Sequence, residues 1–127
     1  MKIGWIGLGA MGGPMAGVLG RAGHEVTAYD LAPELLDRWC TDGVRPAASA
    51  VEAVAGAEVV GVVVATPAQV RPVVLDEQVL TALAPGAVVV VFATIGPDAA
   101  AGVAAVLAER GIGLVDAPIS GGSVRAG

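Results

Sequence analysis

Three glycines near the start of the chain have the spacing that binds a phosphate. Gly7, Gly9 and Gly12 follow a short apolar run and form the pattern Gly-x-Gly-x-x-Gly. The first glycine allows a tight turn after a strand, the second lets the backbone approach a pyrophosphate, and the third allows close helix packing. The N–H groups that open the following helix would then face the anion. The predicted dinucleotide-binding loop consists of Gly7, Leu8, Gly9, Ala10, Met11 and Gly12.

A lone acidic residue, Asp30, follows 23 positions after Gly7. Dinucleotide-binding folds place a carboxylate roughly 20 residues after the loop, where it accepts hydrogen bonds from the adenosine ribose. Its charge would repel the 2′-phosphate of NADP, so we expect NAD as the cofactor rather than NADP. Asp also commonly starts a turn, and this interpretation stays open. Leu31 is expected to contact the cofactor beside Asp30.

Alternating strands and helices predict how these residues are positioned. The expected strands are 2–6, 25–29, 43–46, 58–65, 87–93 and 113–116. The expected helices are 10–22, 33–39, 49–55, about 68–83, and 97–110, with Pro72 either starting or kinking the fourth of them. This alternation predicts a single domain over 1–127 with a Rossmann-type α/β fold. Its doubly wound parallel sheet would have the strand order 3-2-1-4-5-6.

In such a sheet, ligands bind at the carboxyl ends of the strands, where the strand order reverses. This edge would bring the glycine loop near Thr66 and Pro67, after the fourth strand, and Thr94, after the fifth. A helix cap or a turn is the alternative role for both threonines. The segment 116–122 reaches the same edge, and its residues alone are equally compatible with a flexible loop or a functional one.

Composition excludes several classes of partner. The net charge is −5 and the few basic residues are scattered, whereas a nucleic-acid surface needs clustered Lys and Arg. The apolar stretches 59–65 and 87–93 are far too short to span a bilayer, and the start of the chain does not resemble a signal peptide. Cys40 is the only cysteine, so an internal disulfide is impossible. We expect a cytoplasmic protein with a small-molecule partner, no nucleic acid, no membrane and no metal.

Two stretches resemble one enzyme family. The run 7–16, Gly-Leu-Gly-Ala-Met-Gly-Gly-Pro-Met-Ala, and the segment 116–122, Asp-Ala-Pro-Ile-Ser-Gly-Gly, are similar to the β-hydroxyacid dehydrogenases, which include 3-hydroxyisobutyrate dehydrogenase and tartronate semialdehyde reductase. The resemblance extends over the whole chain. It implies an NAD(P)-dependent oxidoreductase that transfers hydride between a small 3-hydroxy acid and a nicotinamide cofactor. The related 6-phosphogluconate dehydrogenases lack the Ala-Pro pair, and imine reductases lack the Ser-Gly-Gly loop.

The resemblance also implies roles for individual residues. Ser120 and the N–H groups of Gly121 and Gly122 would bind the substrate carboxylate, which a hydroxyl beside a glycine nest is able to do. The residues implied to contact the nicotinamide half of the cofactor are Thr66, Pro67 and Thr94.

The resemblance places the catalytic lysine of the family in a C-terminal helical domain that this chain does not include. Lys2, the only lysine, is expected at the opposite edge of the sheet, and His24, the only histidine, in a turn. We therefore assign no catalytic residue within the chain. Two hypotheses follow: the cofactor-binding part of a dehydrogenase, or a stand-alone, non-catalytic dinucleotide-binding module. Without the helical domain, the chain should expose an apolar patch and self-associate.

Overall fold

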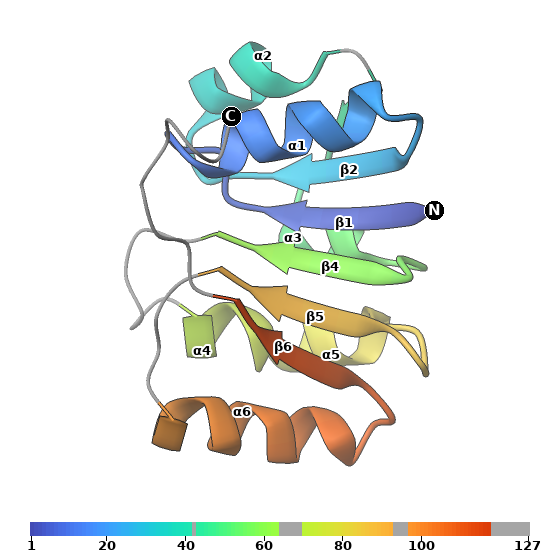
Figure 1. The fold of residues 1–127 in the computed structure, drawn as a ribbon, viewed down its shortest axis with the longest axis vertical. Coiled ribbons are helices and arrows are strands. Elements are labelled where there is room, and N and C mark those ends of the chain that lie inside the picture. Colours follow the sequence, from blue (N-terminus) through green and yellow to red (C-terminus); the bar gives the residue numbers. More distant parts are fainter. Residues whose placement is uncertain (42, 64–69, 93–96, 118–127) are drawn as a thin grey trace.

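The computed structural model describes residues 1–41, 43–63, 70–92 and 97–117. Its strands form one parallel sheet in the order β3-β2-β1-β4-β5-β6 (Figure 1). The strands are β1 (Lys2–Ile6), β2 (Glu25–Tyr29), β3 (Val44–Pro46), β4 (Val59–Val62), β5 (Val88–Val91) and β6 (Gly113–Asp116). The strand order reverses between β1 and β4, as the sequence predicts, and the Rossmann-type fold is confirmed.

Helices cover both faces of the sheet. They are α1 (Gly12–Arg21), α2 (Pro33–Trp39), α3 (Ala50–Val54), α4 (Val70–Val74), α5 (Glu77–Ala82) and α6 (Pro97–Ala108). Residues of α1 and α2 pack with one hydrophobic cluster, and residues of α3, α4, α5 and α6 belong to a second cluster on the other face. Strands β4 and β5 are apolar throughout, and burial along β5 alternates between half-buried and buried valines.

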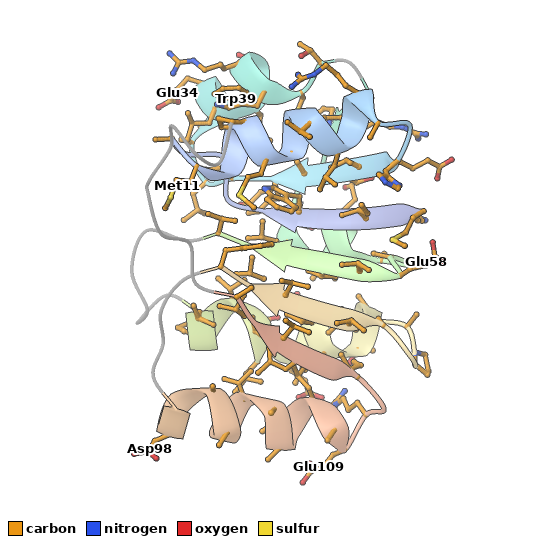
Figure 2. All side chains as sticks on the ribbon, viewed as in Figure 1. Met11, Glu34, Trp39, Glu58, Asp98 and Glu109 are labelled. Atoms are coloured by element: carbon orange, nitrogen blue, oxygen red, sulfur yellow. The ribbon has the colours of Figure 1, made fainter. Side chains whose placement is uncertain are left out.

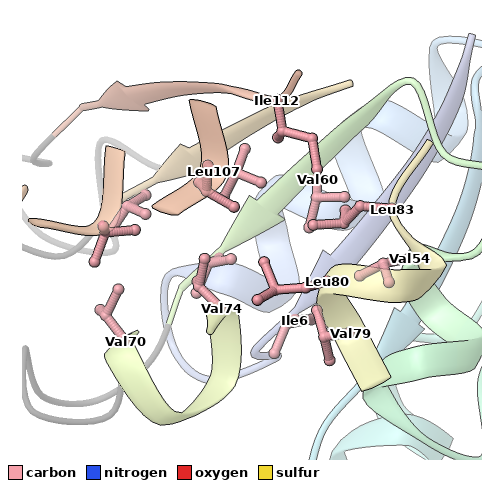
Figure 3. Close-up of a cluster of buried hydrophobic side chains, with 14 of the residues drawn as sticks. Ile6, Val54, Val60, Val70, Val74, Val79, Leu80, Leu83, Leu107 and Ile112 are labelled. Carbon is pink, nitrogen blue, oxygen red and sulfur yellow. The ribbon is translucent and has the colours of Figure 1, made fainter. Parts of the chain in front are cut away.

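The larger cluster is built mainly from valines and leucines (Figure 3). Val62 and Val91 on the central strands are almost completely buried, as is Leu107 from α6. Burying one such side chain contributes about 1.5–3 kcal/mol relative to its exposed state. This cluster anchors β4 and β5 at the centre of the sheet.

The smaller cluster lies beneath the glycine loop and contains Trp5 and Leu8, both almost fully buried. The Trp5 ring lies 5.7 Å from that of Phe92, measured between centroids. A Cβ atom at Gly61 would overlap the Trp5 ring, so the indole occupies space that this glycine leaves open. The loop therefore rests on an aromatic residue of β1.

One predicted helix is wrong. The helix expected over about 68–83 is divided into α4 and α5, and the break lies at Leu75 and Asp76 rather than at Pro72. Pro72 is the third residue of α4, where a helix has no N–H bond to lose. The break comes from Asp76, whose carboxylate accepts hydrogen bonds from the first N–H groups of α5.

Other differences concern element boundaries. Helix α1 begins at Gly12 instead of residue 10 because the residues before it form the loop. It ends as expected, with Gly23 at a φ of +98° and the His24 N–H donating to the Leu19 carbonyl. Strands β4 and β5 are shorter than predicted, and residues 64, 65 and 93 lie outside the described residues. No helix in the described part of the chain is long and apolar enough to cross a membrane.

Candidate cofactor-binding site

A cleft of about 670 Å³ opens beside the carboxyl ends of β1 and β2. Its lining includes most of the predicted glycine loop together with Asp30 and Leu31. The remaining lining residues are Ile6, Tyr29, Leu35, Ala50, Val63, Pro72 and Val73. Figure 2 labels Met11 at this edge of the sheet and Glu58 at the opposite edge. The cleft therefore lies where parallel sheets of this topology bind ligands.

Gly7 and Gly12 are required by close packing. Gly7 has a φ of +106°, and a Cβ atom there would overlap the Val63 carbonyl oxygen. A Cβ atom at Gly12 would overlap the Gly7 carbonyl oxygen and lie 3.2 Å from the Val63 Cβ. The Gly7 N–H donates to the Tyr29 carbonyl at 3.0 Å. These contacts hold the loop against β4 and α1 against the loop, as expected for the first and third glycines of the pattern.

Gly9 differs from the other two glycines of the pattern. A Cβ atom at this position would meet no atom within 4 Å. The N-cap residue of α1, Met11, makes no side-chain hydrogen bond to the helix, and the first turn carries no acidic residue. The first N–H groups of a helix attract an anion through their partial positive charge. An uncapped helix start beside open space therefore fits a pyrophosphate.

Asp30 connects the end of β2 to the loop. Its Oδ2 accepts a hydrogen bond from the Leu8 N–H at 2.8 Å, and its Oδ1 accepts one from the Ala32 N–H at 2.9 Å. The second bond is the turn-forming role that the sequence left open. A carboxylate has about four lone-pair sites, so Asp30 can still accept hydrogen bonds from ribose hydroxyls.

Two predicted contact residues differ in exposure. The Leu31 side chain is 85% exposed and lines the cleft, so it is available to an apolar part of a ligand. The Leu8 side chain is fully buried in the smaller cluster, and its backbone N–H is bonded to Asp30. Leu8 therefore anchors the loop to the smaller cluster, and its side chain does not line the cleft.

Several predicted site residues lie outside the described residues. For the cofactor they are Thr66, Pro67 and Thr94, and for the substrate they are Ser120, Gly121 and Gly122. Their roles stay predictions.

Lys2 and His24 lie where the sequence predicts. Lys2 begins β1 at the amino edge of the sheet, and its backbone N–H donates to the Glu58 carboxylate at 2.8 Å. His24 is half-buried in the turn between α1 and β2. Neither side chain belongs to the cleft lining. The described residues contain no group of three metal-ligating side chains.

Burial, and secondarily the charge of Asp37, raise the pKa of the Cys40 thiol. A thiol with a raised pKa stays protonated at neutral pH and is a poor nucleophile. Cys40 is therefore a partly buried thiol of low reactivity.

Trp5 is a site residue that the sequence interpretation missed. Its indole N–H donates to the Gly7 carbonyl at 2.9 Å from a buried position. The available signal was a tryptophan two positions before the first glycine of the loop.

Comparison with known proteins identifies relatives along nearly the whole chain. The sequence model of the NAD binding domain of 6-phosphogluconate dehydrogenase matches residues 2–127. The chain is 40% identical over 126 residues to the NAD-dependent L-serine dehydrogenase of Pseudomonas aeruginosa, covering 98% of this chain and 42% of that protein. It is 39% identical to the 3-hydroxyisobutyrate dehydrogenase of the same organism, covering 94% of this chain and 41% of that protein.

The solved structure of Mycobacterium tuberculosis 3-hydroxyisobutyrate dehydrogenase with L-serine superimposes with a TM-score of 0.90 at 38% identity. The match covers 97% of this chain and 42% of that one. The chain thus spans about two fifths of the length of these relatives. Its fold, its glycine loop and these matches lead to one conclusion: the chain belongs to the family of NAD-binding domains found in 6-phosphogluconate dehydrogenase and 3-hydroxyisobutyrate dehydrogenase-like oxidoreductases.

Proposed function

We propose that this domain provides the NAD-binding part of a dehydrogenase that oxidises a small 3-hydroxy acid. The observation that carries the proposal is the open start of α1 beside Asp30, in a chain whose relatives are dehydrogenases of small hydroxy acids. The names of these relatives include L-serine and 3-hydroxyisobutyrate, and both compounds have a carboxylate and a hydroxyl group. Bound NAD would supply the acceptor for the hydride that leaves the hydroxyl-bearing carbon.

The chain's own residues bind and orient the cofactor in this proposal. The N–H groups at the start of α1 hold the pyrophosphate, and Asp30 accepts hydrogen bonds from the adenosine ribose. Leu31 contacts the adenosine side of the cofactor. Thr66, Pro67 and Thr94 contact the nicotinamide side, and Ser120 with the following glycines binds the substrate carboxylate.

A base must accept the proton that leaves the substrate hydroxyl. In this proposal the base is a lysine of a second, helical domain. Lys2 is excluded because it begins β1 at the edge opposite the cleft. A base must come within about 2.6–3.2 Å of the proton it removes, or act through one water. The partners in this proposal are therefore a helical domain and a small 3-hydroxy acid.

The test measures NADH formation by the complete polypeptide that contains this domain. The candidate substrates are 3-hydroxyisobutyrate, L-serine and D-glycerate, each with NAD in excess. We expect turnover of at least one of them, and turnover of none contradicts the proposal. The matched variant is Asp30→Asn, which removes the charge, keeps one acceptor oxygen and should raise the KM for NAD.

A second candidate function is a dinucleotide-binding module without catalysis. The position of Lys2, far from the cleft, is the observation that favours it. This function predicts that residues 1–127 bind NAD as tightly as the complete polypeptide does. It also predicts that Ser120→Ala leaves the affinity for NAD unchanged. Substrate turnover by the complete polypeptide excludes it.

We also propose that NAD binds more tightly than NADP, because the Asp30 carboxylate repels a 2′-phosphate. A ligand that binds the folded state raises the melting temperature according to its concentration and affinity. At equal concentration NAD should therefore raise the melting temperature more than NADP, and Asp30→Asn should reduce the difference. Equal stabilisation of the wild-type domain by both nucleotides contradicts this preference.

A further inference from the structure

Trp5 is a buried residue whose one polar group contacts the glycine loop. The side chain is only 2% exposed, and its indole N–H donates to the Gly7 carbonyl oxygen at 2.9 Å. A buried indole N–H usually finds a partner, and here that partner is the first carbonyl of the glycine loop. The contact therefore joins the core of the domain directly to the cofactor-binding backbone.

The peptide unit that joins Gly7 and Leu8 makes a hydrogen bond on each side. The Gly7 carbonyl accepts from Trp5, and the Leu8 N–H donates to the Asp30 Oδ2 at 2.8 Å. In a trans peptide these two groups point in opposite directions within one plane. The indole and the carboxylate therefore hold the Gly7–Leu8 peptide from opposite sides and fix its orientation.

The indole is itself held in place. Gly61 of β4 leaves the space for the ring, and Phe92 packs against it with an interplanar angle of 36°. A closely packed ring has few alternative rotamers, so the direction of its N–H is well defined. The space at Gly61 and the hydrogen bond to Gly7 set the direction of the N–H, whereas Phe92 adds packing on the ring.

We propose that Trp5 is a positioning residue for NAD: its indole N–H sets the Gly7–Leu8 peptide so that the Leu8 N–H holds the Asp30 carboxylate toward the ribose. The inference rests on NAD binding at the glycine loop. Loss of the N–H leaves the Gly7 carbonyl without this partner in a buried place, where an unpaired polar group is costly. The peptide then relaxes and Asp30 loses its fixed orientation.

The first test compares Trp5→Phe with Phe92→Leu by titration calorimetry. Trp5→Phe keeps an aromatic ring and removes the N–H, whereas Phe92→Leu weakens the packing around Trp5 and keeps the N–H. We expect the Kd for NAD to rise at least tenfold in Trp5→Phe and less than twofold in Phe92→Leu. Wild-type affinity in Trp5→Phe, or an equal loss in both variants, overturns the inference.

The second readout is specificity, which a purely structural role would not change. Because Trp5 acts through Asp30, the ratio of the Kd for NADP to the Kd for NAD should fall in Trp5→Phe and stay constant in Phe92→Leu. A ratio that is unchanged in Trp5→Phe contradicts the inference.

A measurement on the wild-type domain covers the case in which Trp5→Phe does not fold. The indole N–H resonance of Trp5, assigned by comparison with Trp39→Phe, should exchange slowly with solvent and shift on saturation with NAD. Fast exchange, or no shift on saturation, overturns the inference. Absence of NAD binding by the wild type refutes the cofactor assignment as well, whereas unimpaired binding by Trp5→Phe refutes this inference alone.

Discussion

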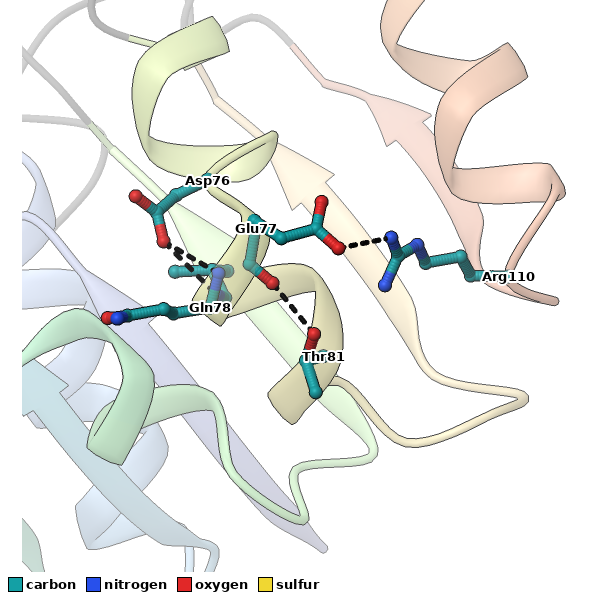
Figure 4. Close-up of polar contacts among 6 residues, drawn as sticks. Asp76, Glu77, Gln78, Thr81 and Arg110 are labelled. Carbon is teal, nitrogen blue, oxygen red and sulfur yellow. Dashed lines mark hydrogen bonds and ion pairs between the residues drawn. The ribbon is translucent and has the colours of Figure 1, made fainter.

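The starts of two helices, α1 and α5, differ in whether a side chain caps their first N–H groups. The first N–H groups of any helix lack partners within the helix. In α5 the Asp76 Oδ1 accepts from the Gln78 and Val79 N–H groups at 3.0 and 3.2 Å (Figure 4). In α1 the N-cap residue Met11 provides no such side-chain bond, and the loop before the helix is rich in glycine.

The two helix starts therefore differ in role: the start of α5 stabilises the fold, and the start of α1 is available to a ligand. A carboxylate cap stabilises a helix by about 1 kcal/mol whether or not a ligand is present. An uncapped start gives up that stabilisation and keeps its N–H groups available to an external anion. We infer that α5 is a structural helix outside the cleft lining, whereas α1 is completed by the cofactor.

The largest expected effect is that of Gly12→Ala. The new Cβ would overlap the backbone oxygen of Gly7, which cannot move freely because the loop is bonded at Tyr29 and Asp30. We expect a loss of about 2 kcal/mol or more in the free energy of unfolding, as for overpacked sites, together with weaker NAD binding. Chemical denaturation measures the first effect and calorimetric titration the second. Normal stability in this variant would show that α1 is not packed closely against the loop.

Gly9→Ala should weaken NAD binding without changing the stability of the fold. Its Cβ would meet no protein atom within 4 Å, so the free energy of unfolding should change by less than about 0.5 kcal/mol. The methyl group would occupy space that the pyrophosphate needs, so the Kd for NAD should rise about tenfold, which corresponds to about 1.4 kcal/mol. Unchanged affinity would place the pyrophosphate elsewhere.

Asp76→Ala is the converse test at α5. Loss of its two hydrogen bonds should lower the free energy of unfolding by about 1 kcal/mol. Asp76→Asn is the matched control, because Asn caps helices about as well as Asp. Both variants should bind NAD with wild-type affinity. A weakened affinity in Asp76→Ala would mean that α5 also takes part in binding.

The smallest effect is expected from Arg110→Gln. Arg110 pairs with Glu77 of α5 at 2.8 Å, but their side chains are 37% and 77% exposed. Exposed ion pairs contribute little, so we expect a change of less than about 0.5 kcal/mol that disappears at high salt. Thermal unfolding at low and high salt checks this. A loss comparable to that of Asp76→Ala would show that the pair is part of the structural start of α5.

The sequence predicted the strand order and the helix ends that depend on local residues. Gly23 and Gly111 follow the expected ends of the helices 10–22 and 97–110 and have φ values of +98° and +73°, and Ser49, at the expected start of the helix 49–55, caps α3. The sequence predicts that Pro72 starts or kinks this helix, whereas the break between α4 and α5 lies at Leu75 and Asp76. Pro is tolerated in a first turn, and Asp76 is the stronger signal.

The candidate site was predicted less completely than the fold. The spacing of Gly7 and Asp30 indicated that both belong to one site, and the structure joins them through the Leu8 N–H. That hydrogen bond connects residues 22 positions apart, so it depends on β1 and β2 being neighbours. The second hydrogen bond of Asp30 reflects the local turn, which the sequence had offered as an alternative.

The most direct test of the account is an NMR titration of the domain with NAD that follows backbone amide resonances. If the open start of α1 binds the pyrophosphate, the shifts should be large at Gly9, Met11 and Gly12 and negligible at Gln78 and Val79, whose N–H groups Asp76 already holds. Shifts of equal size at both helix starts, or none at the glycine loop under saturating NAD, would contradict it.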